Sequence, residues 1–291
     1  MKLIKPSVEI LEQGPGEQGI YDMIELCGKT SYKSPVKGGE EAKKFVDARI
    51  REGHNAVLEF GTVYLTITDQ RLIDNNVWKI WSSPYTKVNH IGLNNYITTN
   101  YRVLVENDAL SALEFLSEPT EFHPKRYCVR FITDRGVSHE LVRHRKMSFC
   151  QESTRYCNYS KDKFGNELTF IIPSWSDLPS GNYEKEEVDG FWTWFCGVEN
   201  VEQQVRDGNG FFLNALRDSE VHYLRLCNEK GWTPQQARQV LPNALKTEIC
   251  VCGFEEDWKH FFGLRCAKNA HPDMQVLAKQ LREQFIENKY I

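Results

Sequence analysis

The order of strand-like and helix-like segments along this 291-residue chain constrains its fold most strongly. Short runs of alternating or β-branched apolar residues predict strands at residues 8–11, 56–68, 96–105, 126–133 and 168–173. Apolar residues at helical spacing predict helices at residues 20–27, 40–52, 109–116, 139–147, 191–230, 235–241, 257–265 and 274–288. The two types are mixed without the regular alternation of a parallel fold, so we expect the α+β class, with an antiparallel or mixed sheet flanked by helices.

The pattern also predicts how these segments are organised. No repeat and no low-complexity linker interrupts the chain, and we expect a single domain over residues 1–291. Residues 126–133 and 63–68 share a half-buried pattern of similar length, and we expect them to pair in an antiparallel sheet. Residues 175–188 are rich in Pro, Gly and charge and are interpreted as a loop.

Charge and cysteine content exclude several classes of protein. The chain carries 36 basic and 40 acidic residues, a formal net charge of -4, so no global positive field exists to recruit nucleic acid or an anionic membrane. Nine Cys occur without a CxxC pair, and their odd number argues against a complete disulfide framework. Lys5, Pro6 and Glu9 interrupt any signal peptide, and no run of about 18 apolar residues occurs. We expect a cytoplasmic protein that is neither exported nor membrane-spanning.

Residues 143–156, RHRKMSFCQESTRY, form the segment with the most specific chemistry. Arg side chains stay charged at any working pH and bind phosphate through two parallel N–H bonds, while hydroxyls and amides satisfy further lone pairs. The segment is therefore suited to an anionic ligand. A solvated basic face beside a turn is the alternative interpretation of such a cluster.

The spacing of the residues in this segment favours the interpretation as a binding site for an anionic ligand. Arg-His-Arg, seven residues, then Ser, then Arg-Tyr two positions later is the signature of flavin-dependent thymidylate synthases, the ThyX family, which this chain resembles here. Two further blocks share the resemblance, residues 53–60 (GHNAVLEF) and 237–242 (ARQVLP), the latter followed by residues 258–265 (WKHFFGLR). The resemblance implies a ThyX-like fold, with insertions around residues 69–125 and 174–200.

The resemblance also implies a set of site residues. Those expected to bind the nucleotide dUMP are Glu140, Arg143, Gln151, Glu152, Ser153, Thr154, Arg155, Arg238 and Arg265. Those expected to bind FAD are His54, Glu59, Arg143, His144, Arg145, Gln151 and His260. Arg265 is the expected catalytic residue, because a fixed cation at the uracil ring stabilises developing negative charge. No metal is expected.

This chain departs from the family pattern at one position of the signature. The family often has Glu two positions before the Ser, whereas here Gln151 stands there and Glu152 follows. Gln still donates and accepts hydrogen bonds, so binding is expected to survive, but a negative charge is lost at that place. For His54, a helix C-cap role stabilised by the helix dipole is as well supported by the residues alone as a flavin role.

Several other motifs match a functional pattern only in part. Residues 14–19 spell GxGxxG, but residues 31–40 (SYKSPVKGGE) cannot form the second buried strand of a dinucleotide-binding unit. His139-Glu140 nearly begins a zinc HExxH motif, yet the position of the second ligand is Arg143. Cys250 and Cys252 lack further ligands at zinc spacing and are predicted to be core thiols. Residues 191–195 (FWTWF) are predicted to form a subunit interface.

The resemblance implies reductive methylation of dUMP to dTMP, with methylenetetrahydrofolate as the carbon donor and NADPH reducing FAD. No Cys nucleophile is expected, and the expected assembly is a homotetramer with shared active sites. Two alternatives from other classes stay open. One is a nucleotide- or RNA-binding protein without catalysis, and the other is a different flavoenzyme that acts on a phosphorylated small molecule.

Overall fold

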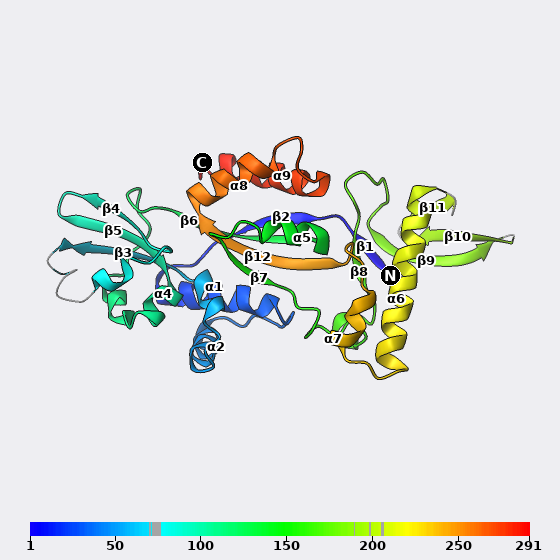
Figure 1. The fold of residues 1–291 in the computed structure, drawn as a ribbon, viewed down its shortest axis with the longest axis horizontal. Helices are drawn as coiled ribbons and strands as arrows, with labels where there is room; N and C mark the ends of the chain where they lie inside the picture. Colours follow the sequence, from blue (N-terminus) through cyan, green and yellow to red (C-terminus); the bar gives the residue numbers. More distant parts are fainter. Residues whose placement is uncertain (70, 72–76, 189, 198, 205–206) are drawn as a thin grey trace.

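The computed structural model describes residues 1–69, 71, 77–188, 190–197, 199–204 and 207–291. Figure 1 shows an elongated molecule with a four-stranded sheet at its centre, a three-stranded sheet toward one end and a five-stranded sheet toward the other. Helices and strands are mixed along the chain, and the expectation of an α+β fold is confirmed. No described helix is long and apolar enough to cross a membrane.

The central sheet positions the signature segment. Its strands are β2 (Ser7–Leu11), β6 (Arg126–Asp134), β12 (Lys246–Phe254) and β7 (Ser148–Gln151), adjacent in that order and all antiparallel. Helices α8 (Glu255–Arg265) and α9 (Pro272–Glu287) cover one face, where Val129 and Phe131 pack with Trp258. Helix α1 (Gly16–Thr30) covers the other face, because alternate strand residues such as Cys128 project there.

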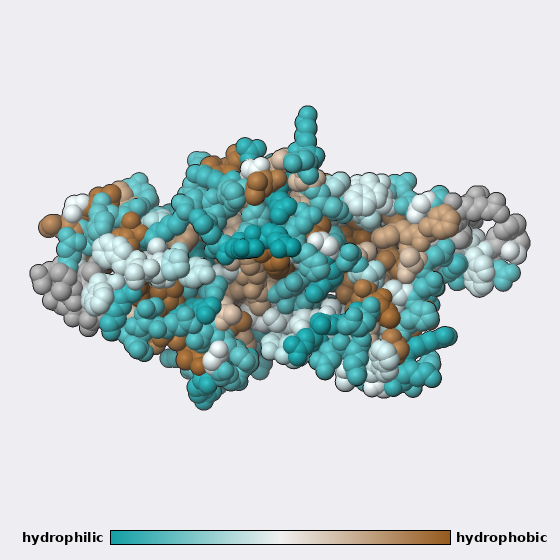
Figure 2. Space-filling model, viewed as in Figure 1, coloured by the Kyte–Doolittle hydropathy of each residue, from teal (hydrophilic) through white to brown (hydrophobic). Residues whose placement is uncertain are grey.

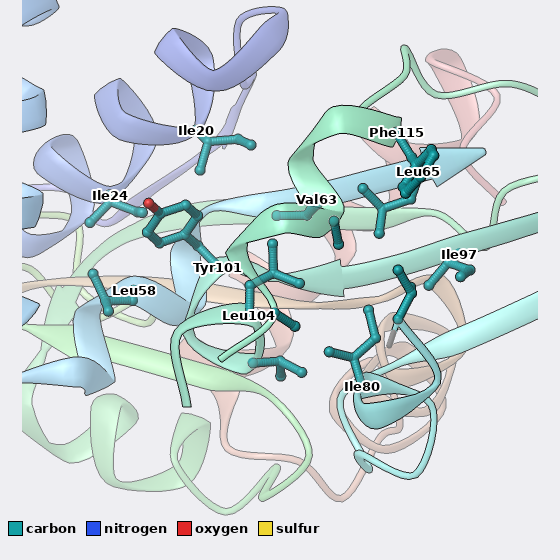
Figure 3. Close-up of a cluster of buried hydrophobic side chains, with 14 of the residues drawn as sticks. Ile20, Ile24, Leu58, Val63, Leu65, Ile80, Ile97, Tyr101, Leu104 and Phe115 are labelled. Atoms are coloured by element: carbon teal, nitrogen blue, oxygen red, sulfur yellow. The ribbon is translucent and has the colours of Figure 1, made fainter. Parts of the chain in front are cut away.

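One end of the molecule is a lobe with its own core. Its elements are α2 (Gly39–Arg51), η1 (Asn55–Phe60), β3 (Thr62–Thr68), η2 (Val77–Ile80), β4 (Lys87–Ile91), β5 (Asn94–Asn100), α4 (Tyr101–Glu106) and η3 (Leu110–Phe115). Strand β5 lies between β3 and β4. Side chains from α1, η1, the strands and the short helices meet in one cluster, including Ile24, Leu58, Val63 and Leu104 (Figure 3). This shared core joins α1 to the lobe.

The other end is built on a mixed sheet. Its strands are β1 (Lys2–Ile4), β8 (Thr169–Ile171), β9 (Gly181–Val188), β10 (Phe191–Cys196) and β11 (Glu199–Gln204), flanked by α6 (Gly208–Asn228), α7 (Pro234–Ala237), η4 (Asp162–Phe164) and η5 (Arg238–Val240). Strands β1 and β8 are parallel, and the other pairs are antiparallel. Thr233 and Gln236 form a capping box that starts α7 and so places Arg238.

The helices predicted near both ends of the chain are confirmed. Helices α1 and α2 match the predicted segments, and the second is followed by Gly53, whose φ of 70° suits glycine. The helix predicted at 235–241 appears as α7 and η5, and those at 257–265 and 274–288 as α8 and α9.

The predicted pairing of residues 126–133 with 63–68 is wrong. Strand β6 pairs with β2 and β12, while β3 pairs with β5. The nine-residue register between β6 and β12 supplies the central ladder of the molecule, and residues 246–254 were not predicted as a strand. The predicted strands at 56–68 and 96–105 are also shortened, because η1 and α4 take their outer parts.

The helical pattern predicted over residues 191–230, with an interruption near Asp207-Gly208, is wrong before that interruption. Only α6 is helical, and β10 and β11 precede it; residues 198 and 205–206 lie outside the described part. Trp194 is 1% exposed and Trp192 is 55% exposed, the alternation of a strand with one buried face. Likewise Gly181–Val188 is a strand rather than part of a loop. The helix predicted at 139–147 is α5 (Arg135–Leu141), and only a 3-10 helix, η3, occurs within 109–116.

Candidate active site

The Arg-His-Arg triplet lies in the turn between α5 and β7 and forms one wall of a cavity. The cavity has a volume of about 540 Å³, and helix α8 forms the opposite wall. We call it the RHR pocket; its lining residues are Arg143, His144, Arg145, Lys146, Met147, Glu256, Asp257, His260, Leu264 and Arg265. Arg143, Arg145 and Lys146 are exposed and form no ion pair within the described residues, so this wall presents three available cations.

Arg265 is held rigidly at the edge of this pocket. Its Nη1 donates to Glu140 Oε2 at 2.7 Å, its Nη2 to the Glu140 carbonyl oxygen at 2.9 Å, and its Nε to His144 Nε2 at 3.0 Å. Three directions of the guanidinium are thereby fixed by α5 and the following turn. The predicted residues Glu140, His144 and Arg265 thus form one hydrogen-bonded unit.

His144 is the neutral member of that unit. It is 8% exposed, and burial, reinforced by the positive charge of Arg265 and by His260, lowers the pKa of His144 to about 4. Its Nε2 accepts the Arg265 hydrogen bond, which requires an unprotonated nitrogen. Around neutral pH the ring therefore orients Arg265 without adding a second charge.

The first half of the signature precedes β7, and its second half lies at the C-terminal end of that strand. Gln151 Nε2 donates to Ser138 Oγ at 2.8 Å and to Thr247 Oγ1 at 3.1 Å, which anchors the strand end to α5 and β12. Arg238 Nη1 donates to Thr154 Oγ1 at 3.4 Å. Arg155 is exposed above the Tyr156 ring, and Ser153 Oγ accepts from the Arg155 backbone N–H at 3.3 Å.

Glu152 is occupied by contacts inside the protein. Its side chain is 1% exposed, pairs with Lys246 Nζ at 2.9 Å and accepts from Tyr159 Oη at 2.8 Å, with Lys33 Nζ at 3.9 Å. Its backbone N–H donates to the Glu248 carbonyl oxygen. This carboxylate therefore anchors the segment from within the core, and its expected contact with the nucleotide stays a prediction.

Arg135 is a candidate binding residue that sequence reasoning missed. Its Nη1 donates to the Glu152 carbonyl oxygen at 3.0 Å and to Thr247 Oγ1 at 3.3 Å, and no carboxylate of the described residues forms an ion pair with it. Burial lowers its pKa, and the nearby positive charge of Arg238 acts in the same direction. Two neighbouring guanidinium groups without a carboxylate partner favour an anion between them. Its place in sequence, between the predicted strand at residues 126–133 and the signature at residues 143–156, was the available signal.

His54 and Glu59 lie in a third place. His54 lines a cavity of about 430 Å³ together with Ser31, Tyr32 and Arg49. Its side chain is 63% exposed, and its Nδ1 lies 3.3 Å from Glu52 Oε2. Glu59 does not line that cavity; its Oε1 accepts from Arg102 Nη1 at 2.6 Å. One chain therefore does not bring these two predicted flavin contacts into a common cavity.

The predicted residues thus form three groups within one chain. Arg143 and Arg265 line the RHR pocket with Arg145 and His260, whereas Arg155 and Arg238 do not line it. Strand β7 separates the two halves of the signature by about 13 Å, at roughly 3.3 Å per residue. The assignments of individual residues to dUMP and FAD stay predictions.

The glycine-rich run at residues 14–19 and the pair Cys250 and Cys252 both have structural roles. A Cβ on Gly19 would lie 1.8 Å from the Gly14 carbonyl oxygen, so the glycines of residues 14–19 allow a loop to lie against α1, and the next element is helix α2. Cys250 and Cys252 are buried, as predicted for core thiols. Among the described residues, no three His, Cys, Asp or Glu side chains are arranged to hold a metal ion.

The chain belongs to the Thy1 family, described as thymidylate synthase complementing protein, which matches residues 119–288. This stretch contains β6, the RHR pocket, β7, Arg238 and Arg265. The resemblance seen in the sequence is therefore confirmed at the level of the family.

Several curated relatives are named flavin-dependent thymidylate synthase. That of Corynebacterium efficiens is 29% identical over 158 residues, 50% of each chain. That of Corynebacterium aurimucosum is 31% identical over 158 residues, 52% of this chain and 55% of the relative, and that of Thermococcus kodakarensis is 29% identical over 154 residues. The chain spans about half the length of the curated relatives it matches.

A solved structure also matches along most of the chain. It is the UMP/dUMP methylase PolB from Streptomyces cacaoi bound with 5-Br dUMP, at 14% identity and a TM-score of 0.44, covering 99% of this chain and 93% of that chain. At that score the likeness is too distant to assign a ligand to this chain.

Proposed function

We propose that this protein is a flavin-dependent thymidylate synthase that converts dUMP to dTMP. The observation that carries the proposal is the RHR pocket, where three exposed cations face helix α8 and a guanidinium is fixed by Glu140 and His144. Family membership and the names of the curated relatives support it. Methylenetetrahydrofolate is the proposed carbon donor, NADPH the proposed reductant, and the cytoplasm the proposed location.

The RHR pocket fits a dinucleotide cofactor such as FAD in its donor set. Arg143, Arg145 and Lys146 suit a pyrophosphate, and Met147 and Leu264 offer apolar contact to a planar ring. FAD when bound would supply the redox chemistry, which belongs to the cofactor rather than to the side chains. The protein's own part is to bind, orient and stabilise charge.

The residues beyond β7 suit the nucleotide's phosphate. Arg238 and Arg155, with the hydroxyls of Ser153 and Thr154, provide the donors that the family resemblance implies. Arg135 adds a further guanidinium beside Arg238. Arg265 would then stabilise negative charge that develops on the uracil ring, as a permanent and pre-oriented cation.

Absorbance spectroscopy tests this function against its rivals. The purified protein is expected to show flavin absorbance bands, and dUMP is expected to perturb them. A colourless protein whose RNA affinity falls steeply with salt would favour the non-catalytic RNA-binding alternative. Flavin bands that do not respond to dUMP would favour another flavoenzyme and contradict the proposal.

Cysteine substitution tests the absence of a thiol nucleophile. Burial raises the pKa of Cys150 and of Cys157 to about 11, so neither thiol is ionised near neutral pH. Replacing Cys150 or Cys157 by Ser is expected to leave dTMP formation within about threefold of the unmodified protein. Loss of turnover with dUMP binding and folding intact would show that a thiol takes part in the chemistry.

We further propose a homotetramer of a single catalytic domain, residues 1–291, whose active sites are shared between subunits. Within one chain, Arg155 and Arg238 lie beyond one end of β7, and Arg143 and Arg265 lie beyond the other. A ligand contacted by all four is most simply reached by side chains from different subunits. Sedimentation should give a mass four times that of the 33.9 kDa chain, and an active monomer would refute the shared site.

A further inference from the structure

Five buried thiols meet between helix α1 and the central sheet, and the proposed reaction uses none of them. This thiol cluster consists of Cys27, Cys128, Cys150, Cys250 and Cys252. All five are free and at most 7% exposed. The strand register places them together, because Cys128 pairs with Cys252 and Cys250 pairs with Cys150 on the face that α1 covers.

Two of these thiols are close enough to react with each other. Cys27 Sγ on α1 lies 3.6 Å from Cys128 Sγ on β6. A disulfide has an S–S distance of about 2.05 Å, so closing the bond needs an approach of roughly 1.5 Å. Cys150 Sγ lies 3.1 Å from Ser31 Oγ and Cys250 Sγ lies 3.5 Å from Thr30 Oγ1. Cys250 also contacts Cys27, and Cys252 contacts Cys128.

Cys128 is the member of this pair with a route to small solutes. It lines a cavity of about 650 Å³ together with Leu11, Met23 and Phe60. Arg126, in the same wall, donates to the Glu59 carbonyl oxygen, Thr62 Oγ1 and Ser148 Oγ, and it forms no ion pair within the described residues. Burial opposes ionisation, but hydrogen bonds from Cys252 and Cys27 and the Arg126 charge lower the pKa of Cys128.

We propose that Cys27 and Cys128 are a disulfide-forming site that reacts with a small peroxide. The Cys128 thiolate attacks one peroxide oxygen, so an S–O bond forms, the O–O bond breaks, and the departing hydroxide takes up a proton as water. The Cys27 sulfur then loses its proton and attacks the Cys128 sulfenic acid; the S–S bond forms and a second water leaves. Two thiols and one hydrogen peroxide thereby give one disulfide and two waters.

The bond would join helix α1 covalently to strand β6 of the central sheet. The two cysteines are 101 residues apart, so the crosslink restricts a long loop of the unfolded chain. Helix α1 is followed by Ser31, whose carbonyl oxygen accepts from the Ser153 backbone N–H at 3.1 Å. We expect oxidation to raise the Tm by about 5–10 °C.

Peptide mapping of the full-length protein tests the site. After treatment with hydrogen peroxide, blocking of remaining thiols and digestion without reductant, the expected product is a peptide pair joined through Cys27 and Cys128, with two of the nine thiols lost. The rise in Tm should be reversed by dithiothreitol. It should be absent in Cys27→Ser and retained in Cys227→Ser, whose thiol lies on α6 outside the cluster.

The mapping on unmodified protein does not depend on whether a variant folds. A crosslink from Cys128 to Cys252, or oxidation confined to Cys227 and Cys266, would overturn the proposal. So would survival of both Cys27 and Cys128 as free thiols after the other cysteines have reacted.

Discussion

Replacing Lys246 by Met is expected to lower the free energy of unfolding by about 3–5 kcal/mol. Lys246 is buried, and its Nζ pairs with the carboxylates of Glu152 and Glu248. Burial disfavours its charge, but the two carboxylates outweigh it and raise the pKa of Lys246. Without the cation, Glu152 stays buried with only Tyr159 and the more distant Lys33, so an uncompensated negative charge is left in the core.

Chemical denaturation measures this effect, and the chain offers a matched control. Lys44 forms an exposed ion pair with Glu41, and Lys44→Met should leave the free energy of unfolding nearly unchanged. The double variant Glu152→Gln with Lys246→Met should lose less than the sum of the single changes, because removing the second charge relieves the first defect. A loss below about 1 kcal/mol in Lys246→Met would mean that Glu152 is not a structural carboxylate.

Replacing Arg265 by Ala is expected to lower kcat for dTMP formation by about 10²–10³-fold while the protein still folds. The guanidinium is fixed by Glu140 and His144, so its charge is already oriented before the substrate binds. Lys should not restore the activity, because an ammonium group cannot reproduce the planar set of three hydrogen bonds. Single-turnover assays with circular dichroism as the folding check provide the measurement.

Two further readouts separate a catalytic role from a merely structural one. Lys259 lies on the same helix in an exposed pair with Glu255, and Lys259→Ala should leave kcat unchanged. In Arg265→Ala the pKa of His144 should rise from about 4, because the positive charge that lowers it is gone, although burial still keeps it below the usual range. An unchanged kcat in Arg265→Ala would contradict the assignment, and an unchanged His144 titration would contradict the geometry of the unit.

Figure 2 shows a face on which hydrophilic residues predominate and hydrophobic residues form small separate patches. The chemistry that distinguishes this chain is therefore local, as its near-balanced charge indicated.

Local pattern predicted helices well where one face is apolar and the ends carry clear signals. Thr233, Pro234 and Gln236 together provide the N-terminal signals of α7. The last two helices were predicted to within about two residues of their ends. Residues 191–196 were misassigned because alternating large aromatics at short range resemble a helical face. Which Trp is buried depends on the strands β9 and β11 on either side.

The amino-acid sequence alone determined the kind of chemistry and the family. Permanent cations, hydroxyls and amides occur at a specific spacing that can be recognised without knowing the fold. Only the tertiary structure decided which charges are available and which are already paired. Glu152 and Gln151 are adjacent in sequence, yet one is sealed in the core by Lys246 and the other anchors α5, because β12 lies alongside β7. Coulombic and hydrogen-bonding energies depend on distance and burial. Here the distances and the burial are set by the pairing of strands about 100 residues apart, and local sequence does not encode that pairing.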